Sequence, residues 1–116
     1  MKVAILGASP KQDRYSNKAQ RMLAEHGHEV FPVNPSGSEV LGVPATTEVP
    51  EGMDTVTLYV GPRNLEPMLD QLIAAAPKRV IFNPGTESEE AMERLQENGI
   101  EVEEACTLVL LSTGTF

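Results

Sequence analysis

The feature that most limits the fold is a short apolar run near the start of the chain that leads directly into a glycine turn. Residues 3–6 read Val-Ala-Ile-Leu, and Gly7-Ala8-Ser9-Pro10 follows without a spacer. An apolar run that ends at a turn is typical of a strand buried on both faces, as in a parallel sheet. Glycine has no Cβ, so the backbone at Gly7 can turn sharply and a phosphate can approach it. The pattern predicts an α/β domain that binds a nucleotide.

The rest of the chain alternates between helical and strand patterns. We expect three helices: one from about Ser16, its N-cap, to Gly27, one capped by Asn64 and ended by Pro77, and one opened by a capping box at 86–89 and ended at 98–99. Further strands are expected at residues 30–33, 55–60, 80–82 and 100–102. Residues 34–54, between the second and third strands, are expected to form an irregular crossover. Residues 106–111 fit either a short buried helix or a final strand. Pro32 has no N–H, so a central position for its strand would need a bulge or a local break in the ladder.

This order of elements predicts the fold class. We expect one domain over residues 1–116 with a single Rossmann-like, doubly wound, mainly parallel five-stranded sheet and helices on both faces. Ligands of such sheets bind beyond the carboxyl ends of the strands, near the switch in strand order. Four loops rich in turn residues lie at those ends, at residues 7–10, 34–37, 61–63 and 83–86.

Composition excludes several classes of partner. A net charge of −8 argues against a nucleic-acid partner, which normally requires a basic field. The N-terminal apolar run is too short for a signal peptide or a membrane span. Cys106 is the single cysteine, which excludes an internal disulfide and a multi-cysteine metal site, and its apolar surroundings predict a buried structural thiol. We therefore expect a cytoplasmic protein with no metal, no membrane partner and no nucleic-acid partner.

A basic cluster follows the glycine turn. Residues 10–22 contain one acid, Asp13, and four basic residues, Lys11, Arg14, Lys18 and Arg21. Lys11 and Arg14 lie between the turn and the expected helix, whose free N–H groups favour anions, and Ser9 adds a hydroxyl donor. This combination predicts a binding site for a pyrophosphate.

Two departures from the dinucleotide fingerprint disfavour NAD. The fingerprint requires G-x-G-x-x-G, whereas this chain reads G-A-S-P-K-Q, and Asn34 stands where an acid would hold the ribose hydroxyls. A ligand with an additional ribose phosphate tolerates the missing acid better. An NADP- or NAD-binding redox or sensor domain is the alternative interpretation, and a Rossmann-like interaction domain that has lost its ligand is a third.

The segments V-A-I-L-G-A-S-P, H-G-H-E-V-F-P-V-N-P, L-G and Y-V-G-P together resemble the small stand-alone CoA-binding proteins. The same domain opens the alpha subunit of succinyl-CoA synthetase and related acyl-CoA synthetases, and the resemblance covers residues 1–106. It implies that coenzyme A or an acyl-CoA is the ligand, with its pyrophosphate on the loop at residues 7–16. It further implies that Asn34-Pro35 and Val60-Gly61-Pro62 flank the adenosine and its phosphate, while Asn83-Pro84-Gly85 lies towards the pantetheine arm.

The sequence alone does not decide the role of two side chains, Arg63 and Tyr15. Arg63 can pair with a phosphate, stack on adenine or remain solvated, and Tyr15 can cover the ligand or simply sit on the loop. The residues and the resemblance together predict a cofactor site formed by Gly7, Ala8, Ser9, Lys11, Arg14, Ser16, Lys18, Asn34, Pro35, Val60, Gly61, Pro62, Arg63, Asn83, Pro84 and Gly85.

No catalytic constellation accompanies this site. His26 and His28 flank the turn after the first helix, at the sheet end opposite the strand carboxyl ends, and no zinc motif is present. Ser9 lacks a His/Asp partner set, which favours a phosphate ligand over a nucleophile. The synthetases that share this domain use a phosphorylated histidine in a further domain, which is not part of this sequence. We expect a non-catalytic binding protein. A second copy of the chain and an enzyme are both possible partners, and the sequence does not choose between them.

Overall fold

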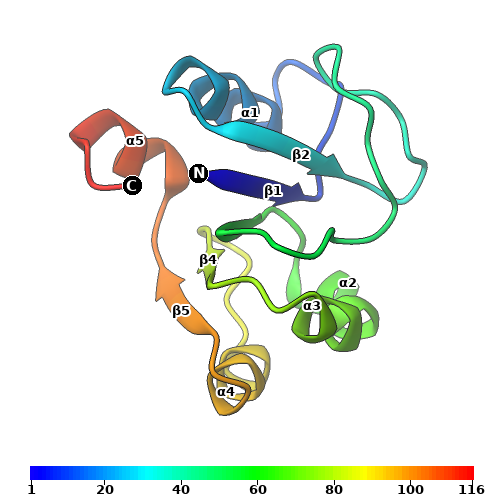
Figure 1. Ribbon diagram of the computed structural model, residues 1–116, viewed down its shortest axis with the longest axis vertical. Coiled ribbons are helices and arrows are strands. Elements are labelled where there is room, and N and C mark those ends of the chain that lie inside the picture. The colour runs from blue at the N-terminus through cyan, green and yellow to red at the C-terminus, as the bar shows by residue number, and fades with distance from the viewer.

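The computed structural model describes residues 1–116 and contains one five-stranded sheet (Figure 1). The strands lie in the order β2-β1-β3-β4-β5, and every neighbouring pair is parallel. The predicted parallel α/β sheet is therefore confirmed. The strands are β1 (Lys2–Leu6), β2 (Glu29–Val33), β3 (Thr55–Leu58), β4 (Arg79–Phe82) and β5 (Glu101–Glu104).

Helices cover both faces of this sheet, as Figure 1 shows. Alternate residues of β1 point to opposite faces, so Val3 and Ile5 join the core under α1 and α5, whereas Ala4 and Leu6 join the larger core under α3 and α4. None of the helices is long and apolar enough to cross a bilayer. The helices are α1 (Tyr15–Glu25), α2 (Pro62–Leu65), the short 3-10 helix η1 (Glu66–Met68), α3 (Leu69–Ala75), α4 (Glu89–Glu97) and α5 (Thr107–Thr113).

The predicted N-cap of the first helix is wrong. Arg14, not Ser16, precedes α1, because the carbonyl of Arg14 already accepts hydrogen bonds from the N–H groups of Asn17 and Lys18, at 3.1 and 3.2 Å. Ser16 lies buried in the first turn of the helix. Since Arg14 offers no capping oxygen, the N–H groups of that turn keep no side-chain partner.

Two other helix starts also differ from the expectation. Gly61 precedes α2, and Asn64 lies inside it, because Pro62 has a φ suited to the first helical turn and needs no N–H there. Ser88, rather than Thr86, caps α4 by accepting a hydrogen bond from the N–H of Ala91 at 3.2 Å. Thr86 lies three residues before the first residue of α4 and so outside the cap position, and its hydroxyl donates to the carbonyl of Asn83.

The position of β2 at the sheet edge explains Pro32. The ladder has no bulge, because only β1 pairs with β2 as a strand and the other side of β2 meets a loop. There the N–H of Thr46 donates to the carbonyl of Pro32 at 3.1 Å, and the N–H of Asn34 donates to the carbonyl of Thr46 at 3.0 Å. Part of the crossover at residues 34–54 is thus attached to the edge by a single bridge, between Val33 and Thr46.

The structure also corrects or completes three other elements of the expected secondary structure. β3 ends at Leu58, so Tyr59 and Val60, which the pattern placed inside the strand, belong to the loop beyond it. The apolar segment at 106–111 adopts a helix, α5, and not a final strand. β5 continues to Glu104 at the other edge of the sheet.

The switch in strand order lies between β1 and β3. The chain leaves β1 towards β2 on one side, and β3 pairs with β1 on the other, so the loops after β1 and β3 diverge and leave a crevice. Gly7 lies at this crevice with φ +96°, and a Cβ at this position would lie 2.8 Å from the carbonyl oxygen of Tyr59. Glycine is therefore required here both by its backbone angle and by the close approach of β3.

We predict that Gly7→Ala costs about 1–3 kcal/mol more free energy of unfolding than Gly52→Ala, measured by urea denaturation. Gly52 also has a positive φ, +80°, but no atom lies within 4 Å of the place that a Cβ would take there, so this variant isolates the cost of the backbone angle. Equal losses for the two variants would show that β1 and β3 can separate to admit the methyl group.

Candidate nucleotide-binding site

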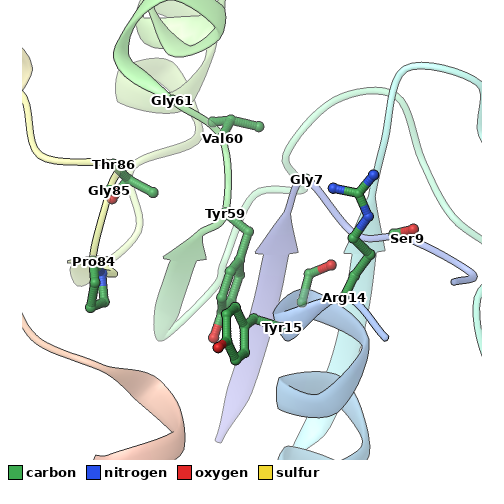
Figure 2. Close-up of a pocket in the computed structure, with 11 residues that line it drawn as sticks. Gly7, Ser9, Arg14, Tyr15, Tyr59, Val60, Gly61, Pro84, Gly85 and Thr86 are labelled. Atoms are coloured by element: carbon green, nitrogen blue, oxygen red, sulfur yellow. The ribbon is translucent and has the colours of Figure 1, made fainter. Parts of the chain in front are cut away.

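A cleft of about 310 Å³ opens at the carboxyl ends of β1, β3 and β4 (Figure 2). Three loops form its walls, and each of them follows one of these strands. Eight of the predicted site residues meet here, namely Gly7, Ser9, Arg14, Ser16, Val60, Gly61, Pro84 and Gly85. Tyr15, Tyr59 and Thr86 complete the lining.

The first wall of this cleft offers hydrogen-bond donors without partners of their own. The N–H groups of Tyr15 and Ser16 at the start of α1 make no hydrogen bond within the protein. Ser9 Oγ accepts the N–H of Lys11 at 3.2 Å, which leaves its own hydrogen free to donate. Arg14 pairs with no carboxylate, and Figure 2 shows its guanidinium beside Ser9. Helix N–H groups, a hydroxyl and a guanidinium together suit an anion, above all a phosphate, and we call this cleft the phosphate cleft.

Other predicted residues of this loop do not line the cleft. Ala8 is buried in the smaller core. Lys11 is exposed on the loop, and the Lys18 ammonium lies over the ring of Tyr15, 5.3 Å from its centre. These two lysines add positive potential near the cleft without forming its surface.

A second cavity of about 550 Å³ adjoins the cleft and shares Gly7 and Val60 with it. It lies between the ends of β1 and β2 and the helical segment after β3, with Asn34 and Pro35 in one wall. Its lining is largely apolar, which suits the flat face of a nucleoside, and we call this second cavity the nucleoside cavity. The other lining residues are Leu6, Val33, Thr47, Asn64, Pro67 and Met68.

The amide side chains of Asn34 and Asn83 are engaged by the protein itself. Asn34 Nδ2 donates to the carbonyl of Ser38, and its Oδ1 accepts the N–H of Ser38, both at 3.0 Å. Asn83 Nδ2 donates to Thr57 Oγ1 and to the carbonyl of Leu58, and its Oδ1 accepts the N–H of Thr107 at 2.8 Å. Both asparagines therefore hold the shape of their loops, and the oxygen of each amide already accepts a hydrogen bond within the protein.

The structure separates Pro62 and Arg63 from the other predicted residues. They line a distinct cleft of about 210 Å³ between α2 and α4, together with Ser88 and Arg94. Arg63 is therefore absent from the lining of both the phosphate cleft and the nucleoside cavity.

A carboxylate reaches the third wall of the phosphate cleft. Glu87 Oε1 accepts the N–H of Gly85 at 2.7 Å, although Gly85 itself lines the cleft. The Glu87 carboxylate thus occupies the N–H of Gly85, which an anionic ligand could otherwise reach, and it places a negative charge beside the cleft.

The fold and the cleft define a small α/β protein with a parallel Rossmann-like sheet and a candidate ligand site, and comparisons with known proteins place it in a family. The model of the CoA binding domain matches residues 1–112, so the chain belongs to the CoA-binding domain family. This confirms the resemblance found in the sequence.

Curated relatives and solved structures are similar to the chain, and two of the former and three of the latter illustrate this. The uncharacterised protein YneT of Bacillus subtilis (strain 168) is 28% identical over 101 residues, covering 84% of this chain and 75% of YneT. An ADP-forming acetate–CoA ligase of Archaeoglobus fulgidus is 34% identical over 68 residues, which are 56% of this chain but only 10% of the ligase.

Among solved structures, an uncharacterised protein is 52% identical with a TM-score of 0.94, covering 99% of this chain and 97% of that one. A hypothetical protein from Pyrococcus horikoshii OT3 is 32% identical with a TM-score of 0.89, covering 96% of this chain and 81% of that one. An acetyl-coenzyme A synthetase of Ca. Korarchaeum cryptofilum, with 22% identity and a TM-score of 0.75, shares the fold over 87% of this chain and 25% of its own length.

We predict that Glu87→Gln strengthens the binding of CoA several-fold, and more at low than at high ionic strength. The glutamine oxygen can still accept the N–H of Gly85, so the change removes charge and keeps the hydrogen bond. Calorimetric titration measures the effect, and Glu93→Gln on the exposed side of α4 is the control with the same change in net charge. Equal gains for both variants would contradict a local effect of Glu87.

Proposed function

We propose that this protein binds coenzyme A or an acyl-CoA at the carboxyl ends of its parallel strands and does not transform it. The observation that carries the proposal is the junction of the donor-rich phosphate cleft with the larger apolar cavity at Asn34-Pro35. The two cavities meet at Gly7 and Val60, so one ligand can place a diphosphate in the first and a nucleoside in the second.

The residues present fit such a ligand. Gly7, Ser9, Arg14 and the free N–H groups at the start of α1 would hold the diphosphate, and the walls at Pro35 and Val60 would contact the adenosine. At the end of β2, Asn34 Oδ1 already accepts hydrogen bonds from the N–H of Ser38 and from Ser36 Oγ, and no carboxylate lines this cavity, so it offers no acceptor for the ribose hydroxyls of the kind that an NAD site requires. This supports CoA over NAD. Membership of the CoA-binding domain family supports the same choice.

The chemistry of the lining supports binding without turnover. Ser9 Oγ has no histidine or carboxylate within hydrogen-bond distance that could activate it. His26 bonds the carbonyl of Met22 within its own helix, and His28 lies beside the N-terminal amine at the opposite end of the sheet. Burial raises the pKa of Tyr59 to about 12, so its hydroxyl stays protonated and is not a base at neutral pH.

The role that we assign is therefore that of a nucleotide-holding module, as a carrier, a sensor or a partner of an enzyme. A cytoplasmic location, the absence of nucleic-acid and membrane partners, and assembly with a second copy or an enzyme stay predictions from the sequence.

We predict that CoA raises the melting temperature more than dephospho-CoA, NAD or NADP do, because a ligand that binds only the folded state stabilises it. Arg14→Ala should weaken CoA binding by ~1.5–3 kcal/mol through loss of a charge-assisted contact with phosphate. Lys78→Ala is the control, because this exposed lysine lies at the amino ends of the strands and carries the same charge.

Two results would contradict this function. If millimolar CoA does not raise the melting temperature, the protein does not bind CoA. If NADP or NAD stabilises it and CoA does not, the alternative of a redox or sensor domain replaces the one proposed.

A further inference from the structure

A third cavity, of about 290 Å³, lies on the far side of the phosphate cleft from the nucleoside cavity. It shares Tyr15, Tyr59 and Pro84 with the phosphate cleft, whereas the nucleoside cavity shares Gly7 and Val60 with it. The three cavities therefore follow one another, with the phosphate cleft in the middle. The remaining lining of the third cavity comes from Asn83, Cys106 and Leu108.

The lining of this cavity selects an uncharged occupant. No charged side chain is part of it. The Asn83 amide is already engaged by Thr57, Leu58 and Thr107, so the surface is formed chiefly by rings, a proline, a thiol and a leucine. A flexible, uncharged chain can enter such a space, whereas a phosphate or a carboxylate would lose its hydration without compensation.

Tyr15 stands at the boundary between this cavity and the phosphate cleft. It is the first residue of α1, and 68% of it is exposed, an unusual state for a large aromatic side chain. Tyr15 and Tyr59 both line this cavity, and the Lys18 ammonium over the ring of Tyr15 is its one cationic contact. When an apolar chain covers an exposed ring at the mouth of an apolar cavity, both surfaces are removed from water and the complex is stabilised.

The covalent structure of CoA matches this row of cavities. Its adenosine and its pantetheine arm are attached to opposite ends of one diphosphate. A diphosphate in the middle cleft with adenosine at Asn34-Pro35 directs the arm towards Tyr15, Tyr59 and α5. This step rests on the function proposed above.

We propose that Tyr15 closes over the uncharged, thiol-bearing arm of the ligand, which occupies the third cavity with its far end beside Cys106 and Leu108. Tyr15 then determines the affinity for the arm and contributes little to that for the nucleotide. Of the two roles that the sequence left open for Tyr15, this proposal selects the ligand contact.

The first test compares two ligands on three proteins by calorimetric titration. The ligands are CoA and 3′-phosphoadenosine diphosphate, which is CoA cut back to its diphosphate, and the proteins are wild type, Tyr15→Ala and Tyr15→Phe. Tyr15→Ala should weaken CoA about tenfold and leave the shortened nucleotide unchanged, while Tyr15→Phe keeps both affinities because the ring remains.

The outcomes separate the placement of the arm from the proposed function. If neither ligand binds the wild-type protein, the proposed function itself is wrong. If both bind and Tyr15→Ala weakens them equally, or weakens neither, the cavity does not hold the arm. Leu41→Ala, which removes an exposed apolar side chain that lines none of the three cavities, is the control for nonspecific effects of substitution.

A second test locates the arm directly. Cys106 is the single cysteine and only partly buried, so whole-protein mass spectrometry reports its alkylation by iodoacetamide. Acetyl-CoA, which has no free thiol to consume the reagent, should slow this alkylation, and 3′-phosphoadenosine diphosphate should not. Equal protection by both ligands, or protection by neither while both bind, would overturn the placement of the arm.

Discussion

The site depends on the close approach of the backbone of Gly7 to the end of β3. The N–H groups of Gly7 and Ala8 both donate to the carbonyl of Val33 in β2, at 3.0 and 3.1 Å, and the N–H of Tyr59 donates to the carbonyl of Leu6 at 2.8 Å. One turn thereby joins the ends of three strands. Because a side chain at Gly7 would collide with the Tyr59 carbonyl, only glycine allows this junction. The nucleoside cavity and the phosphate cleft lie on its two sides.

A second constraint acts at the opposite end of the row of cavities. The Asn83 side chain joins the ends of β3 and β4 to the first residue of α5, and Thr57 and Thr107 share a hydrogen bond of 2.8 Å beside it. These buried groups satisfy one another, so the network holds α5 against the sheet. The wall formed by Cys106 and Leu108 is therefore fixed relative to Pro84, which keeps the third cavity open.

Local patterns were sufficient for much of this architecture. The apolar run before Gly7 and the alternation of helices and strands predicted the parallel sheet, and the turn residues at strand ends predicted where the cleft lies. The helix starts could not be located because several residues near each start have the residue type of a cap, and only the backbone path decides which of them directly precedes the helix. Thr86 resembles a cap in sequence, yet it lies three residues before the first residue of α4, and Ser88 caps that helix.

The remaining differences concern side-chain partners that are distant in sequence. Nothing near Asn83 indicates that its amide is consumed by Thr57 and Thr107, and nothing near Arg63 indicates that α2 turns it towards α4. Tyr59 and Thr86 were missed as lining residues. Their position directly after the ends of β3 and β4, where such sheets bind ligands, was the available signal.

The most direct measurement is a titration of the isotope-labelled protein with CoA, followed by amide NMR shifts. We expect the shifts to concentrate at Gly7, Ser9, Tyr15, Ser16 and Thr86, while amides at the amino ends of the strands, such as that of Glu29, stay unchanged. Shifts that cluster in the cleft between α2 and α4, or no shifts at saturating CoA, would contradict the proposed site.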